Sequence, residues 1–249
     1  MMTAVKTRQE IADMRTSGKM LATVLEYLRQ KTAVGLTPKD MSKLAAEKLK
    51  YLGGEPAFKG YQGYPDIICI SVNNQVQHSI PDDDPFQEGD VINYDFGVRY
   101  KGMITDAGIT VGVGKISSEA KRLIEGTKQA LDEGIAVVQD GVRVGDISAA
   151  IEATLNRYKL GIVRDLVGHG VGHNLHEDPN IPNYGPKGKG PILTEGMTVA
   201  IEPISTLGGH EIVTDPNGWT FWTEDGSWSA QFEHTILVTR NGAEVLTKL

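Results

Sequence analysis

Four acidic residues lie inside or beside apolar, strand-like runs, where an acid is unusual. Asp95 and Asp106 are eleven positions apart in NYDFGVRYKGMITDAGIT, on two runs that resemble a hairpin. Glu202 ends the apolar run of MTVAIE, and Glu233 precedes the β-branched run of EHTILVT. A buried carboxylate is costly unless it is paired or bound to a cation. Any one of these acids could instead lie on a solvated face, but the four together predict a cation site.

Three histidines, His169, His173 and His176, are spaced among glycines in GHGVGHNLHEDP. The spacing of the first two could suggest a helical zinc motif, but the glycines disfavour a helix. They favour an extended or looped backbone that approaches another group closely. The segment HEDPN is not H-E-x-x-H, because position 180 is Asn. A lone histidine is usually structural, and three within eight residues weaken that interpretation.

Carboxylates with few nitrogens and no thiolates indicate a particular kind of metal site. Such a set favours the harder ions Mn, Fe or Co, with Zn possible, over a structural zinc site. The acids are too many for one cation. Two ions that share bridging carboxylates would balance the charge, activate a bridging water and stabilise a tetrahedral intermediate.

Two halves of the chain resemble each other at a separation of about 106 or 107 residues. Gly35 begins GLTPKDMSKLAAEKLK, and Gly141 begins GVRVGDISAAIEATLN. Asp95 and Glu202 each come seven residues after the glutamate of a Glu-Gly pair. This predicts a single catalytic domain, 1–249, of two half-repeats at about 1–115 and 116–249, with the metals between them. The alternative is chance similarity between amphipathic elements.

Helices precede strands in each half. Helix starts are predicted at the Thr7 capping box, at Thr37 before a proline, at Ser117 or Ser118, and at Asp146. Strands are predicted at 67–72, 91–98, 104–111, 198–205 and 235–239. This order indicates an α+β fold, in which helices cover one face of a mostly antiparallel sheet.

The composition is that of an ordinary globular protein. Hydrophobic residues make up 40 % and charged residues 23 % of the 249 residues, and the net charge of -7 argues against nucleic acid as the main ligand. Cys69 is the single cysteine, which excludes an intrachain disulfide and favours a reducing compartment. No apolar leader or membrane-length run is evident, so a cytoplasmic protein is expected.

These motifs together resemble type I methionine aminopeptidase, a member of the pita-bread metallopeptidases. The resemblance covers nearly the whole chain and is carried by GYPDIICISVNNQVQHSIPDD, the Asp95/Asp106 pair, GHGVGHNLHEDP, EGMTVAIEP and SAQFEHTILVT. It implies a curved, mostly antiparallel sheet of two pseudo-symmetric halves. It also implies removal of the initiator methionine, when the second residue is small, by a metal-activated bridging water.

The resemblance assigns metal roles to five positions. Asp95 would chelate one ion, and His169 and Glu202 the other. Asp106 and Glu233 would bridge the two ions, which would be Co, Mn, Fe or Zn. Glu202 would also move a proton during the reaction.

Substrate roles follow from the same resemblance. His78 would contact the peptide nitrogen, and His176 would hydrogen-bond the carbonyl oxygen as negative charge develops. A methionine pocket would be formed by Tyr61, Tyr64, Cys69 and Trp219. A monovalent cation, Na or K, would lie near Asn73, Gln75 and Ser229.

Some positions depart from the family pattern. The run DFGVRYKGMITDAGIT is more similar to the Xaa-Pro aminopeptidase and prolidase branch, and unusual residues near the pocket are Phe58, Lys59, Ser79 and Leu175. The alternatives are therefore a prolidase-like enzyme or a non-catalytic pita-bread binding protein. The expected partners are N-terminal Met peptides and nascent proteins, with transient ribosome contact open. A monomer is expected, with no nucleic-acid substrate and no membrane association.

Overall fold

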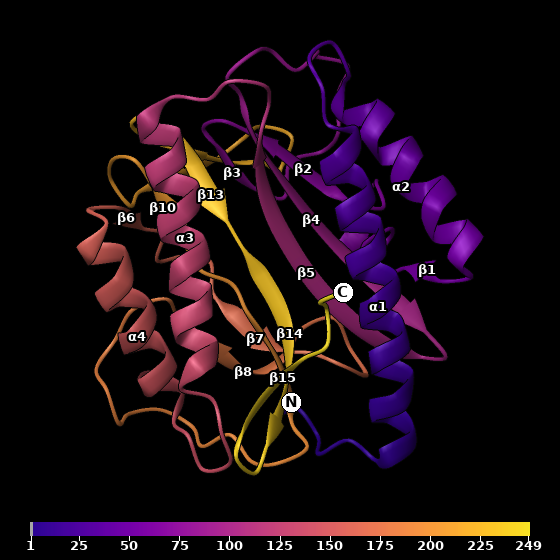
Figure 1. Ribbon diagram of the computed structural model, residues 1–249, viewed down its shortest axis with the longest axis vertical. Helices are drawn as coiled ribbons and strands as arrows, with labels where there is room; N and C mark the ends of the chain where they lie inside the picture. The colour runs from indigo at the N-terminus through magenta and orange to yellow at the C-terminus, as the bar shows by residue number, and fades with distance from the viewer. Residues whose placement is uncertain (1) are drawn as a thin grey trace.

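Helix starts follow the predicted capping signals in a computed structural model that describes residues 2–249 (Figure 1). Thr7 caps α1 (Arg8–Lys31) in a capping box, where the Glu10 carboxylate accepts the Thr7 N–H at 2.7 Å. Thr37 caps α2 (Pro38–Leu52) in the same way. Ser117 caps α3 (Ser118–Ala136), which settles the choice between two serines. These three predicted starts are confirmed. They could be predicted because a helix cap depends on residues only three positions apart.

The fourth helix begins earlier than predicted. α4 covers Val144–Arg157, whereas the prediction started it at Asp146. Asp146 lies in the first turn, and its carboxylate accepts the backbone N–H of Arg143 at 3.1 Å. An acid three positions after the cap commonly stabilises a helix start in this way. The acid therefore marks the first turn, not the first residue.

Fifteen strands and one short 3-10 helix, η1 (Tyr61–Gly63), complete the chain within residues 2–249. The first half carries β1 (Glu55–Pro56), β2 (Cys69–Val72), β3 (Gln75–Gln77), β4 (Val91–Tyr100) and β5 (Met103–Gly112). The second half carries β6 (Gly161–Ile162), β7 (Gly168–Gly170), β8 (Glu177–Ile181), β9 (Thr198–Ile201), β10 (Ile204–Thr206), β11 (Ile212–Thr214), β12 (Phe221–Thr223), β13 (Ser229–Gln231), β14 (Glu233–Thr239) and β15 (Gly242–Val245).

The strands form one large sheet and two small ones. The nine-stranded sheet runs β1-β4-β5-β14-β9-β7-β8, with β2 beside β4 and β15 beside β14. The small sheets are β13-β10-β6 and β11-β12-β3. The ladders between these named strands are antiparallel, as predicted.

The prediction of one strand over 198–205 was wrong. β9 belongs to the main sheet, while β10 belongs to a small sheet. Glu202 and Pro203 lie in the break between them. Proline has no N–H for a ladder, so the chain leaves the main sheet directly after β9. The break places Glu202 at a strand end.

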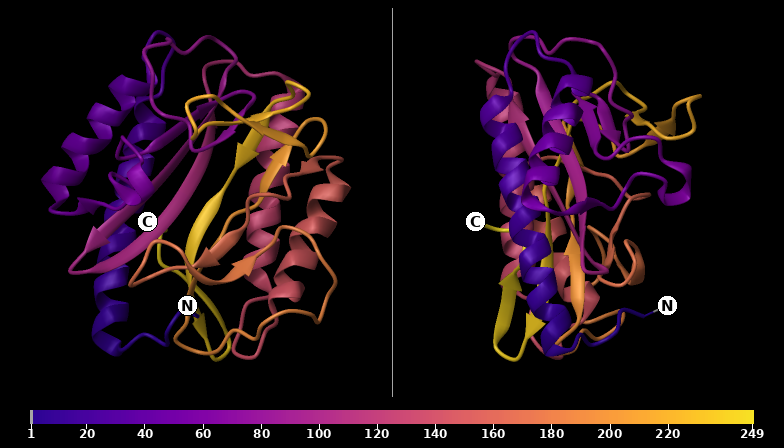
Figure 2. Two further views of the ribbon diagram at one scale, coloured as in Figure 1. Left: turned by 180° about the vertical axis from the view of Figure 1, so that it is seen from behind. Right: turned by 90° about the vertical axis from the view of Figure 1, so that its right-hand side faces the viewer.

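All four helices cover one face of the curved main sheet, as the back and side views in Figure 2 show. One buried cluster joins α1 and α2 to β4, and includes Leu21, Met41 and Tyr94. A second joins α3 and α4 to β9 and β14, and includes Ile147 and Ile236. The predicted α+β fold, with helices on one face of a mostly antiparallel sheet, is therefore confirmed. Among residues 2–249, no helix has the length and apolar character needed to cross a membrane.

Candidate metal centre

Five neighbouring segments of the main sheet each carry one predicted metal ligand. Asp95 lies on β4, Asp106 on β5 and Glu233 on β14. Glu202 directly follows β9, and His169 lies on β7. Because these strands are consecutive in the order β4-β5-β14-β9-β7, the sheet brings together residues that the chain separates widely.

Strand register places three of the acids on the same face. Gly108 of β5 pairs with Asp95 on one side and with Glu233 on the other. Asp106 lies two residues from Gly108 on β5, and side chains two apart on a strand share a face. A Cβ at Gly108 would overlap the side-chain amide of Gln231. Because Gly108 has no side chain, the amide of Gln231 can occupy this space next to the acids.

Burial excludes the alternative of a solvated sheet face for these acids. The five candidate ligands are between 2 % and 8 % exposed. Burial raises the pKa of Asp95 to about 7. Burial, followed by the charge of neighbouring carboxylates, raises the pKa of Asp106, Glu202 and Glu233 above the usual range. Such a cluster is stable in its ionised form only with a compensating cation.

Unpartnered oxygen atoms show that the donor set fits a divalent ion. Oδ1 of Asp95, Oδ1 of Asp106 and Oε1 of Glu233 are buried without a hydrogen-bond partner. Ligand atoms of Asp106, His169 and Glu233 lie within 4.8 Å of one another. Buried oxygens that lack protein donors and converge in this way are typical of a metal site.

The His169 ring is in a state suited to metal binding. Its Nδ1 lies 2.9 Å from the carbonyl oxygen of Gly170. Since a carbonyl can only accept, Nδ1 carries the proton and Nε2 carries the lone pair. Nε2 lies 3.6 Å from Oε1 of Glu202. Burial lowers the pKa of His169 to about 3, which keeps the ring neutral.

A buried amide network behind the acids was not identified from the sequence. Asn93 donates to Oε1 of Gln77 at 3.3 Å and to Oε1 of Gln231 at 3.0 Å. Gln77 in turn donates to Asp95 at 3.0 Å, and Gln231 donates to Glu233 at 3.1 Å. A sequence signal existed, since Asn93 and Gln231 each lie two residues before an acid and so share its face.

A cavity of about 300 Å³ opens onto the five candidate ligands. Its walls include every residue predicted for the methionine pocket and the two histidines predicted to contact substrate: Tyr61, Tyr64, Cys69, Trp219, His78 and His176. Phe58 and Leu175 also line it. The walls away from the acids are thus largely aromatic and aliphatic.

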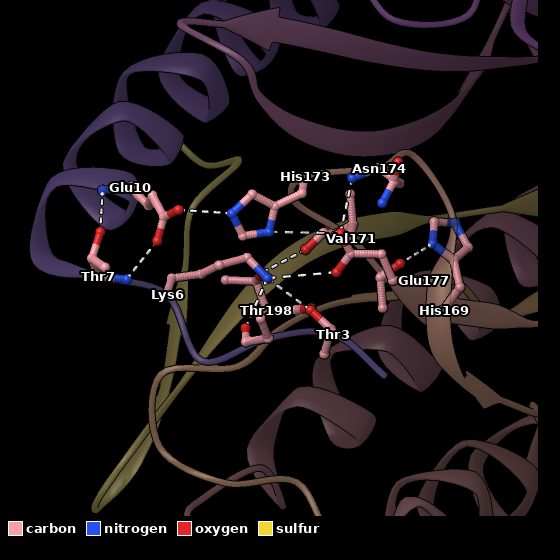
Figure 3. Close-up of polar contacts among 12 residues, drawn as sticks. Thr3, Lys6, Thr7, Glu10, His169, Val171, His173, Asn174, Glu177 and Thr198 are labelled. Atoms are coloured by element: carbon pink, nitrogen blue, oxygen red, sulfur yellow. Dashed lines mark hydrogen bonds and ion pairs between the residues drawn. The ribbon is translucent and has the colours of Figure 1, made fainter. Parts of the chain in front are cut away.

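Burial favours the neutral form of His78 and His176, the two histidines that were predicted to contact the substrate. Nδ1 of His176 lies 3.0 Å from the hydroxyl of Tyr61, and the ring centroid of His176 lies 4.2 Å from that of His169. Burial lowers the pKa of His78 to about 4 and also lowers the pKa of His176. His173 is 43 % exposed at its side chain and contacts Glu10 at 2.7 Å, outside the cavity (Figure 3).

The other positions noted in the sequence are not among the residues that line this cavity. Ser79 is buried, and its hydroxyl accepts a hydrogen bond from Ser71 at 3.0 Å. Lys59 is exposed. The three residues predicted to hold a monovalent cation are adjacent, because the Ser229 hydroxyl donates to the carbonyl of Gln75 at 2.9 Å and that of Asn73 at 3.3 Å.

The fold and these residues are those of a metallopeptidase, and comparison with known proteins identifies the family. Residues 12–240 match the sequence model of metallopeptidase family M24, and the chain belongs to this family. The protein is similar to the methionine aminopeptidase of Clostridium perfringens, with 41 % identity over 99 % of both chains. It is also similar to methionine aminopeptidase 1 of Bacillus subtilis, with 40 % identity over 98 % of both chains.

Solved structures agree with this assignment. A crystal structure of methionine aminopeptidase from Thermotoga maritima has a TM-score of 0.98 and 44 % identity, with complete coverage of both chains. Prolidase from Pyrococcus furiosus has a TM-score of 0.81 and 22 % identity, and covers 98 % of this chain and 65 % of that one. The second likeness shows a shared pita-bread fold. The M24 family implies that the centre holds divalent metal ions.

Proposed function

We propose that this protein is a dinuclear metallo-aminopeptidase that removes an N-terminal methionine when the second residue is small. One observation carries the proposal: four buried carboxylates and a neutral histidine converge at a cavity with apolar walls. Full-length similarity to methionine aminopeptidases supports the substrate class.

Two divalent ions would be held by the five candidate ligands. Asp95 would hold one ion, His169 and Glu202 the other, and Asp106 and Glu233 both. The oxygens of Asp95, Asp106 and Glu233 that lack protein donors support metal binding at these acids, and the division between the two ions follows the family resemblance. Co, Mn, Fe and Zn are the candidate ions. When bound, such ions supply an acidified water and a Lewis acid for the scissile carbonyl.

Protein groups would orient the substrate and move its protons. With the Tyr61 hydroxyl donating to Nδ1 of His176, the opposite ring N–H is free to donate to the carbonyl oxygen. His78, neutral and buried, would contact the peptide nitrogen as the amine leaves. Glu202 would pass a proton to that amine.

The cavity walls suit a thioether side chain. Tyr64 and Trp219 meet edge to face, with ring centroids 5.2 Å apart. Cys69 and Leu175 line the same space. Aromatic edges and soft sulfur atoms interact favourably with methionine. These residues would admit methionine and exclude charged N-terminal side chains.

We also propose the finer features expected from the sequence. Asn73, Gln75 and Ser229 would hold a Na or K ion beside the site. The domain would consist of two half-repeats, supported by the pairing of α1 with α2 and of α3 with α4 over the sheet (Figure 1). A monomer that meets nascent chains in the cytoplasm, with transient ribosome contact, is consistent with this substrate.

Metal reconstitution tests the proposal. The metal-stripped protein is titrated with Mn, Co, Fe or Zn, and released methionine is measured from Met-Ala-Ser and Met-Leu-Ser. We expect binding of two ions and release from Met-Ala-Ser, with little from Met-Leu-Ser. Binding without any hydrolysis would support the non-catalytic alternative.

A further inference from the structure

A buried ion pair joins the N-terminal segment to the start of β8. Nζ of Lys6 lies 3.5 Å from Oε2 of Glu177, and the two side chains are 0 % and 6 % exposed (Figure 3). Surface lysines rarely lose all contact with water unless they are paired. The pair lies outside the metal-binding cavity.

The N-terminal segment is held by backbone hydrogen bonds at Thr3 and at Lys6, to β8 and to the turn before β9. The N–H of Thr3 donates to the carbonyl of Asp178 at 2.6 Å, and the N–H of Lys6 donates to the carbonyl of Gly196 at 2.8 Å. The ammonium group also donates to the Thr3 hydroxyl at 2.8 Å and to the Ala4 carbonyl at 2.9 Å. Together with the ion pair to Glu177, these bonds give the ammonium group three oxygen neighbours.

The other carboxylate oxygen of Glu177 organises the preceding turn. Oε1 accepts the N–H of Asn174 at 2.8 Å, and the carbonyl of Asn174 accepts the N–H of Gly172 at 3.0 Å. A Cβ at Gly172 would overlap the Lys6 side chain. The turn 171–176 therefore packs directly around the Lys6–Glu177 pair.

This turn connects the two histidines of the site. His169 precedes it on β7, and His176 ends it immediately before Glu177. Their ring centroids are 4.2 Å apart at an angle of 88°. We infer that Lys6 is a positioning residue, which holds Glu177 and thereby the turn that presents His176 to the substrate carbonyl. This inference rests on the proposed function.

A positioning role and a purely structural role of Lys6 can be distinguished by whether its substitution changes kcat or only the melting temperature. Loss of a merely structural contact lowers the melting temperature but leaves kcat of the folded protein unchanged. Loss of a positioning contact lowers kcat, because small misplacement of an oxyanion donor is costly. The substrate pocket and metal ligands are untouched, so KM and metal stoichiometry stay near wild type.

The test compares Lys6→Met and Lys6→Arg in the full-length metal-loaded protein. Arg15→Met is the matched control, since Arg15 pairs with Glu244 on the surface, with a side chain that is 52 % exposed. Below the melting temperature of every variant, we expect Lys6→Met to lose roughly 10- to 100-fold in kcat on Met-Ala-Ser. Lys6→Arg should recover part of this loss, and Arg15→Met should match wild type.

Hydrogen exchange provides a readout that does not depend on activity. Lys6→Met should speed exchange at the backbone amides of Gly172 and Asn174. If Lys6→Met does not fold, Glu177→Gln replaces it in the test and should speed exchange at the same two amides. Wild-type kcat together with unchanged exchange at these amides would overturn the inference. If the wild-type protein itself cleaves no Met peptide, the proposed function fails, while the exchange rates still decide whether Lys6 holds the turn.

Discussion

Asn93 and Gln231 are 138 positions apart, and the side-chain amide of Asn93 donates to Oε1 of Gln231 at 3.0 Å. This bond fixes which end of the Gln231 amide is the acceptor. Its Nε2 must then face Glu233, where it donates at 3.1 Å. The network thus orients a candidate metal ligand from behind, which leaves Oε1 of Glu233 for a cation.

Removing Asn93 should therefore weaken metal binding without touching a ligand. Asn93→Ala frees the Gln231 amide to rotate, and loss of such an outer hydrogen bond typically costs 10- to 100-fold in metal affinity. Calorimetric titration with Mn or Co measures the effect. Gln30→Ala, which removes a surface amide that bonds Glu26 on α1, is the matched control. Equal affinities for both variants would contradict the account of this network.

The metal-free protein should lose stability as the pH rises. The folded pKa values of Asp95 (about 7), Asp106, Glu202 and Glu233 lie above the ordinary values of 3.8 and 4.5. At pH values above these ordinary pKa values, the four carboxyls bind more protons in the folded state than in the unfolded chain. Their contribution to the free energy of unfolding therefore falls as the pH rises. Below about pH 6.5 the lowered pKa values of His78, His169 and His234 oppose this trend, so thermal melts with chelator between pH 7 and pH 8 should show the decline, and added metal should restore more stability at pH 8. A metal-free melting temperature that rises over this range would refute it.

Asp106→Asn should raise the stability of the metal-free protein and lower its affinity for metal. The variant replaces a buried carboxyl, which is costly at pH 8 whether ionised or protonated, with a neutral amide. At pH 8 its metal-free form should therefore melt at least ~2 °C above metal-free wild type, the shift that about 1 kcal/mol produces in a chain of this size. It should also lose more metal affinity than the roughly 10- to 100-fold expected for outer partners. Melting and titration of both proteins measure these effects. A destabilised variant that still binds two ions would contradict the assignment of Asp106.

His176→Ala should affect chemistry more than binding. Loss of one donor to a developing oxyanion typically lowers kcat about 100- to 1000-fold. KM and metal stoichiometry should remain near wild type, because His176 is not among the candidate ligands. Steady-state kinetics on Met-Ala-Ser measure the change, with His210→Ala on a partly exposed loop position as control. A variant with normal kcat would remove His176 from the mechanism.

Leu175→Ala should loosen the methionine pocket. Leu175 is 4 % exposed and lines the same cavity as Trp219. The substitution removes three carbon atoms from the pocket wall, and loss of even one methylene contact in such a pocket costs about 10-fold or more in kcat/KM. The loss should appear with Met-Ala-Ser and be much smaller with Ala-Ala-Ser, which does not fill the pocket. An equal loss on both peptides would indicate general damage to the site.

The helices were predicted well because helix caps and the apolar face of a helix depend on residues that are close in the sequence. Thr7, Thr37 and Ser117 start their helices as expected. The error at 198–205 arose because an apolar run continues through Glu202 and Pro203, although the strand does not. Tertiary pairing, which assigns β9 and β10 to different sheets, is not visible in a local pattern.

The metal ligands of the candidate site could be predicted because their residue types are unusual in their sequence surroundings. Acids within apolar runs stand out, and the sheet brings all four together with His169. The amide network was not identified, although Asn93 and Gln231 each lie two residues before an acid, because amides near acids are common in any chain. Lys6 was not identified because a lone lysine carries no comparable signal. Lys6 and Glu177 meet only through the fold, so their pairing required the structure.

The central claim is tested most directly by a competition assay. Metal-loaded protein is given Met-Ala-Ser and Ala-Pro-Ser together, before and after removal of metal with a chelator. The account predicts release of methionine from Met-Ala-Ser, little cleavage of Ala-Pro-Ser, and loss of activity on chelation that Mn, Co or Fe restores. Cleavage of Ala-Pro-Ser without cleavage of Met-Ala-Ser would contradict it and favour the prolidase-like alternative.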